Sequence, residues 1–99
     1  MKVLVKKSPI PAKKFRAVFP DGRTVDFGAT GYSDFTLHKD PERMRRYVMR
    51  HGRGREDWGK SGMYTAGFWS RWLLWSRPSI GAAAQYIHSR FGLSVKFIK

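Results

Sequence analysis

The chain of 99 residues has room for one hydrophobic core and therefore for a single domain. It contains no cysteine, which excludes disulfides, thiolate metal sites and a cysteine nucleophile. Its 20 Lys and Arg residues against 7 Asp and Glu give a net charge of +13, which predicts an acidic partner such as nucleic acid. No apolar run reaches the roughly 20 residues of a membrane-spanning helix, so we expect a soluble protein without a membrane span.

The positive charge is concentrated at the two ends of the sequence. Residues 1–20 carry +6, residues 21–57 carry +1 and residues 58–99 carry +6. Pro9 and Pro11 interrupt regular structure early in the chain. We therefore expect residues 1–13 to form a basic, semi-extended arm, with a short edge strand at its start as the alternative, and residues 14–99 to form the domain.

Residues 14–28 predict a β-hairpin. The sequence Pro20–Gly22 is typical of a three-residue loop, because proline presets a type I turn and glycine takes the left-handed position after it. Pairing Phe19 with Arg23 across this loop makes one face apolar and places opposite charges together on the other. The expected partners are Phe15 with Phe27, Arg16 with Asp26, and Ala17 with Val25.

A loop and a helix are expected next. Residues 28–39 are rich in Gly, Ser, Thr and Asp, and three apolar side chains should anchor this loop to the core: Tyr32, Phe35 and Leu37. Asp40 as N-cap, Pro41 in the first turn and Gly52 as terminator predict a helix between them. Its outer face should carry a basic ridge formed by Arg43, Arg46 and Arg50. Arg53 and Arg55 follow in a glycine-rich loop.

The densest apolar segment spans residues 64–75 and predicts a helix of about a dozen residues. Phe68, Trp72 and Trp75 share one stripe, which Trp69 and Leu73 widen. The remaining outer wedge is expected to hold Ser70, Arg71, Leu74 and Arg77. The aromatic residues form the core in one interpretation, and in the other they form a face for a protein partner or for exposed bases.

Residues 79–91 predict a further amphipathic helix, from Ser79 to the stop at Gly92. Residues 93–97 alternate as a closing strand. Together these elements predict an α+β fold, in which a small antiparallel sheet of the hairpin and the C-terminal strand packs against two to three helices.

No catalytic or metal-binding motif is recognisable. The three histidines, His38, His51 and His88, lie in separate segments without carboxylates at ligand spacing. The acidic pairs lie beside arginines and helix starts, where capping and charge pairing explain them. We therefore expect a protein that is not an enzyme, with no cofactor and no metal.

Four blocks in order carry a family resemblance: "DGRTVDFG", "GYSDFTLHKD", "RYVMRH" and "AGFWSRWLLWSRP". Over residues 14–80 the sequence resembles a family of small, basic, uncharacterised proteins encoded by nucleocytoplasmic large DNA viruses. The resemblance implies a viral origin and a place in the virion, as a minor capsid or packaged protein, with the host cytoplasm or viral factory as its location during infection. It carries no catalytic residue.

Two hypotheses of function follow. In the first, the protein is a structural component of the virus particle that cements acidic surfaces of other capsid or virion proteins, with a homo-oligomer left open. In the second, it binds DNA or RNA through phosphates without reading sequence. In both, the contacts are assigned to Arg43, Arg46, Arg50, Arg53, Arg55, Lys6, Lys7, Lys13 and Lys14, while Phe68, Trp69, Trp72 and Trp75 form the core or a partner surface.

Overall fold

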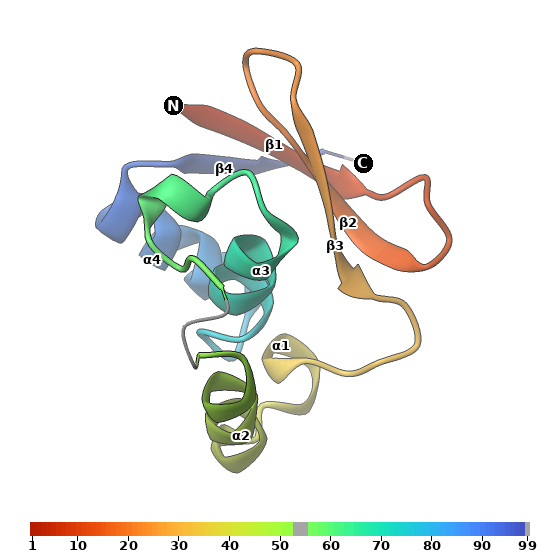
Figure 1. Ribbon diagram of the computed structural model, residues 1–99, viewed down its shortest axis with the longest axis vertical. Helices are drawn as coiled ribbons and strands as arrows, with labels where there is room; N and C mark the ends of the chain where they lie inside the picture. The colour runs from red at the N-terminus through yellow and green to blue at the C-terminus, as the bar shows by residue number, and fades with distance from the viewer. Residues whose placement is uncertain (53–55, 99) are drawn as a thin grey trace.

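The computed structural model describes residues 1–52 and 56–98 as an α+β fold with a mixed four-stranded sheet in the order β3-β2-β1-β4. All the helices lie on one side of this sheet (Figure 1). The strands are β1 (Lys2–Lys7), β2 (Lys13–Val18), β3 (Thr24–Ala29) and β4 (Ser94–Phe97), and the helices are α1 (Phe35–His38), α2 (Pro41–His51), α3 (Ala66–Trp69) and α4 (Ile80–Phe91). Within the described residues, no helix combines the length and apolar character needed to cross a membrane.

The predicted hairpin is confirmed as β2 and β3. The backbone amide of Phe19 donates to the carbonyl of Arg23 at 2.9 Å, and Gly22 has the left-handed φ of 90° that its turn position requires. The partners are those expected from the alternation, Phe15 with Phe27, Arg16 with Asp26, and Ala17 with Val25.

The prediction of an N-terminal arm is wrong for residues 2–7. These residues form β1, which pairs antiparallel with β2 on one side and parallel with β4 on the other. The apolar alternation buries Val3 and Val5 fully on the face toward the core, and the two partner strands place β1 inside the sheet rather than at its edge. Pro9 and Pro11 lie in the connection to β2, where no ladder hydrogen bond is required of them.

The expectation of a purely antiparallel sheet is also corrected, because β4 runs parallel to β1 and does not pair with a strand of the hairpin. Gly92 ends α4 with a left-handed φ of 71°, and the chain then enters the sheet beside β1. The other edge of β1 is already occupied by β2. The C-terminal strand therefore completes the sheet at the side that the hairpin leaves open.

The tryptophan-rich segment forms the centre of the core. Phe68 and Trp69 are fully buried and Trp72 is 5% exposed, which confirms the core interpretation for these three. The helix begins at Ala66 rather than Tyr64, and residues Ser70–Leu74 form a π-helical turn.

This π turn corrects the predicted outer wedge. A π turn holds more residues than an α turn, so side chains that follow its start are rotated relative to a regular helical wheel. Leu74 consequently points inward and is 2% exposed. Its Cδ1 lies so close to Gly28 of β3 that a Cβ built there would approach it to 2.9 Å.

The predicted anchors of the 28–39 loop are correct in one case of three. Asp34 caps the short helix α1 by accepting from the amide of Thr36 at 2.9 Å, and this turn directs Phe35 into the core. Tyr32, 74% exposed, and Leu37, 64% exposed, do not anchor the loop. Within the same capped turn, Phe35 is thus buried while Leu37 is exposed.

Candidate functional site

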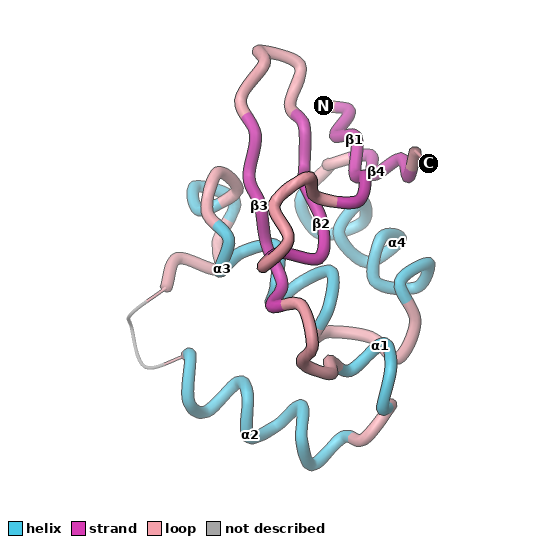
Figure 2. The backbone as a smooth tube through the Cα atoms, turned by 90° about the vertical axis from the view of Figure 1, so that its right-hand side faces the viewer, coloured by secondary structure: helices cyan, strands magenta, loops and turns pink. Residues whose placement is uncertain are grey.

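Helix α2 lies at the end of the molecule away from the sheet (Figures 1 and 2). Its predicted start is confirmed, because the Asp40 side chain accepts from the amide of Glu42 at 2.9 Å and Pro41 occupies the first turn. The helix docks through Tyr47, whose ring stacks on Trp75 with centroids 4.4 Å apart and an interplanar angle of 1°. This contact fixes which face of α2 remains exposed.

The basic ridge is the most prominent feature of that exposed face. Arg43, Arg46 and Arg50 are all exposed, and no carboxylate among residues 1–52 and 56–98 forms an ion pair with any of them. Glu42 pairs instead with Arg45, at 2.9 Å. Together with Trp75, the three ridge arginines line a hollow of about 110 Å³.

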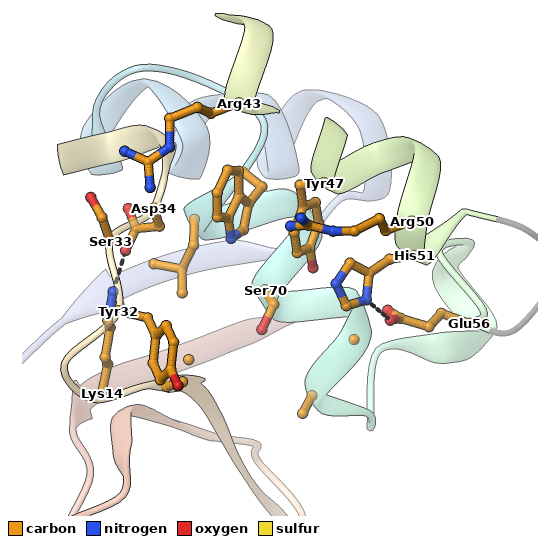
Figure 3. Close-up of a pocket in the computed structure, with 16 residues that line it drawn as sticks. Lys14, Tyr32, Ser33, Asp34, Arg43, Tyr47, Arg50, His51, Glu56 and Ser70 are labelled. Atoms are coloured by element: carbon orange, nitrogen blue, oxygen red, sulfur yellow. Dashed lines mark hydrogen bonds and ion pairs between the residues drawn. The ribbon is translucent and has the colours of Figure 1, made fainter. Parts of the chain in front are cut away.

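A larger cleft of about 440 Å³ lies beside the ridge, between α2, the end of β3 and the tryptophan-rich helix. Arg43 and Arg50 belong to its lining and bring two ridge cations to it. In Figure 3, Lys14 and Asp34 lie on one side of the cleft, and Ser70 lies near its centre. The ridge and the cleft therefore form one continuous site, which we call the α2 site.

One wall of the α2 site is built around a buried ion pair. The ammonium of Lys14 lies 2.7 Å from a carboxylate oxygen of Asp34, and their side chains are 15% and 3% exposed. Asp34 is also the cap of α1, so the pair ties the sheet to the loop that carries Tyr32. Gly28, with a left-handed φ of 79°, leaves room for the side chain of Lys14, since a Cβ at position 28 would lie 3.1 Å from Cβ of Lys14.

The opposite wall is formed by His51 and Glu56, which Figure 3 shows linked across the cleft edge. Nδ1 of His51 lies 2.8 Å from one carboxylate oxygen of Glu56, and the indole N–H of Trp58 donates to the other at 3.0 Å. Burial, reinforced by the nearby Glu56 charge, raises the pKa of Tyr47 well above its usual value, so its phenol is neutral. Both carboxylates of the cleft thus have partners, whereas Arg43 and Arg50 have no carboxylate partner among the described residues.

Some of the predicted contact residues meet in the α2 site and others do not. The site brings together four of them: Lys14, Arg43, Arg50 and Trp75. Arg46 adjoins them in the smaller hollow. Lys6, Lys7 and Lys13 do not line the cleft, and Lys6 lies in register with Arg16 on the sheet. Arg53 and Arg55 lie outside the described residues.

Sequence reasoning missed several residues that line the cleft: Tyr32, Asp34, Glu56 and Ser70. For Asp34 a local signal existed, because an Asp two residues before a Thr at the start of a short apolar stretch has the pattern of a helix cap. For Tyr32 and Ser70 no such signal exists, since their place depends on how the sheet and helices pack.

The α2 site presents exposed arginines, whose chemistry suits anions. Guanidinium groups present planar, paired donors that match phosphate oxygens, and they stay protonated at any physiological pH. Among the described residues, no group of three or more His, Cys, Asp or Glu side chains is arranged to hold a metal ion. The groups that the ridge and the cleft present to solvent include guanidinium cations and the ring of Tyr32.

Comparison with known proteins gives one family match. Searches of curated proteins and of solved structures found no match. Residues 3–51 match a protein family that is described as a family of unknown function, DUF5754. The matched segment runs from β1 through α2 and contains Lys14, Tyr32, Asp34, Arg43 and Arg50 of the α2 site. In this segment the chain is similar to DUF5754.

Proposed function

We propose that this protein binds nucleic acid non-enzymatically, by contacting phosphates without reading base sequence. The observation that carries the proposal is the row of three exposed arginines on α2, which no carboxylate of the described residues neutralises. Arg43 and Arg50 are seven residues apart and thus about 10 Å apart along the helix axis. A row of this length suits several phosphates of one polymer rather than a single small anion.

The net charge of +13 supports the same proposal but does not locate the contact. Any strongly basic protein attracts polyanions at low salt, and this general attraction is screened as salt rises. A specific surface differs in one respect: its arginines contribute more to binding than other cations of the same charge. The test of function is therefore a comparison between positions at constant net charge.

The test uses fluorescence anisotropy with labelled DNA at one fixed, moderate salt concentration. One variant carries Arg43→Gln, Arg46→Gln and Arg50→Gln, which keeps good helix formers on α2. The matched control carries Lys2→Gln, Lys60→Gln and Lys96→Gln, three exposed lysines outside the α2 site. We expect the ridge variant to lose about tenfold or more in affinity, and the control to lose much less.

Equal losses in the two variants would contradict the proposal, because they would show a general charge effect with no preferred surface. No binding of wild-type protein to DNA or RNA at low salt would exclude it altogether. Circular dichroism of both variants establishes that they are folded. Scrambling the base sequence of the probe should leave the affinity of the wild-type protein unchanged.

A second candidate function, a structural protein of the virus particle, is favoured by a different surface. The face of the sheet opposite the helices is uncovered (Figure 1). On it, a hollow of about 280 Å³ is lined by Lys2, Leu4, Val18, Phe19 and Pro20, which combines apolar area with positive charge. An acidic surface of a capsid protein has the complementary charge. If wild-type protein fails to bind nucleic acid, this candidate remains.

A further inference from the structure

Resting on the nucleic-acid function proposed above, we propose that the cleft of the α2 site receives one unstacked nucleotide of a single strand. Its base would lie against Tyr32, and its phosphates would lie on Arg43 and Arg50. The cleft volume of about 440 Å³ falls within the range typical of small-molecule pockets, about 300–1,000 Å³. The protein would therefore prefer single strands to duplexes.

Tyr32 is the first observation behind this assignment. Its side chain is 74% exposed, although tyrosine is normally at least partly buried. No ring of the described residues stacks on it. Its backbone is nevertheless held in place, because its amide donates to the carbonyl of Ala29 at 3.3 Å and Gly31 before it adopts a φ of 88°. A free ring on a fixed backbone is suited to stack on a base.

Other rings of the cleft cannot take this role. Trp75 already packs against two rings, stacked on Tyr47 with centroids 4.4 Å apart and tilted against His38 with centroids 5.2 Å apart. Tyr47 is 6% exposed and stacks on His51 as well. Among the rings that line the cleft, Tyr32 is the most exposed and packs against no other ring of the described residues, and it lies at the side where Lys14 and Asp34 also lie (Figure 3).

The charges of the cleft fit a phosphodiester. Asp34 is paired with the ammonium of Lys14 at 2.7 Å, and Glu56 accepts a hydrogen bond from the indole N–H of Trp58 at 3.0 Å with Nδ1 of His51 at 2.8 Å. These contacts reduce their repulsion of an incoming phosphate. The hydroxyl of Ser70 lies near the centre of the cleft and offers both a donor and an acceptor to a base edge.

The position of Arg46 indicates a strand rather than a free nucleotide. It is absent from the cleft lining but shares the adjoining hollow of about 110 Å³ with Arg43 and Arg50. A phosphate next to the inserted nucleotide would reach Arg46 by following the ridge. A duplex cannot use the cleft in this way, because its bases are stacked and paired, and extruding one costs free energy.

The test measures the affinity of three labelled probes by anisotropy at one salt concentration. The probes are a single strand of about 12 thymidines, an abasic strand of the same length, and a duplex, since one binding module covers about 4–16 nucleotides. Wild-type protein should bind the thymidine strand at least fivefold more tightly than the abasic strand or the duplex.

Three variants locate the contact. Tyr32→Ala should lose at least fivefold on the thymidine strand and nothing on the abasic strand, because the lost interaction is with a base. Tyr32→Phe, which keeps the ring, should bind as wild type does. Leu37→Ala is the matched control, since Leu37 is also exposed and follows in the same segment but does not line the cleft.

The outcomes separate this inference from the proposed function. If wild-type protein binds the thymidine and abasic strands equally, or if Tyr32→Ala changes neither, the inference is overturned. Binding that still depends on the ridge arginines would then leave the proposed function standing. If none of the three probes binds wild-type protein, both proposals fail together.

Discussion

His38 shows how a single side chain connects the α2 site to the core. Its Nδ1 accepts from the amide of Asp40, the cap of α2, at 2.9 Å, and its ring packs against Trp75 with centroids 5.2 Å apart. Its Nε2 is buried without a hydrogen-bond partner among the described residues. Burial, followed by the charge of Arg43, lowers the pKa of His38, while Asp40 and Asp34 oppose the shift.

This lowered pKa predicts a loss of stability in mild acid. In the unfolded chain His38 binds a proton near the ordinary histidine pKa of 6.5, whereas the folded chain resists this protonation because its pKa is lowered. Stability from this group is therefore complete above about pH 6.5 and decreases as the pH falls through the folded pKa. We expect the free energy of unfolding of His38→Asn, in which an amide oxygen can accept from Asp40, to fall less between pH 7 and 5 than that of wild type.

Urea unfolding at several pH values measures this difference directly. His88→Asn is the matched control, because His88 is exposed near the end of α4. The control should follow the pH dependence of wild type. If the His38→Asn and wild-type curves run parallel from pH 7 to pH 5, His38 does not contribute the acid sensitivity.

At the scale of elements, the helix that runs from α3 through the π turn organises the molecule. Its indole N–H groups donate to loop carbonyls, that of Trp69 to Met63 at 2.7 Å and that of Trp72 to Trp58 at 2.8 Å. The guanidinium of Arg71 lies over the ring of Trp72, 4.5 Å from its centroid, and donates to the carbonyl of Trp75 at 2.6 Å. The tryptophans therefore hold the preceding loop as well as the core.

Replacing Trp72 with alanine should cost about 3–5 kcal/mol, because it removes a large buried ring and leaves a cavity. That is a large part of the roughly 5–15 kcal/mol by which domains are stable. Trp72→Phe should cost less, since it keeps most of the apolar contact, although it loses the hydrogen bond to the loop. An unchanged midpoint of chemical denaturation for Trp72→Ala would contradict its place in the core.

Local sequence rules were sufficient for some elements and insufficient for others. The hairpin around Pro20–Gly22 and the helices α2 and α4 were predictable, because turn and cap residues define their ends. The position of β1 and the direction of β4 were not, because strand order is decided by packing between distant segments. The π turn that buries Leu74 also has no local signature in the sequence.

The candidate site was predictable in part for the same reason. The ridge on α2 follows from helical periodicity alone, and the structure confirms that its three arginines are exposed. The cleft beside it requires Lys14 and Asp34, which are 20 residues apart in the chain, to meet at 2.7 Å. That contact depends on the cap of α1 and on Gly28, so only the folded chain shows it.

At the scale of the whole molecule, the positive side chains differ in whether a carboxylate neutralises them. Some cations have partners, such as Arg16 with Asp26 at 2.9 Å and Arg45 with Glu42 at 2.9 Å. The ridge arginines have no carboxylate partner among residues 1–52 and 56–98 and border the cleft or its adjoining hollow. The α2 site thus combines arginines that no described carboxylate neutralises with a concave surface.

The dependence of affinity on salt tests the central claim most directly. Each phosphate contact to duplex DNA contributes about 0.9 to the slope of log affinity against log salt, and each contact to a single strand about 0.7. Replacing Arg43, Arg46 and Arg50 with Gln should make the slope shallower by about 2 on single strands, while Lys2→Gln, Lys60→Gln and Lys96→Gln should leave it nearly unchanged. Equal slopes for wild type and the ridge variant would contradict the account.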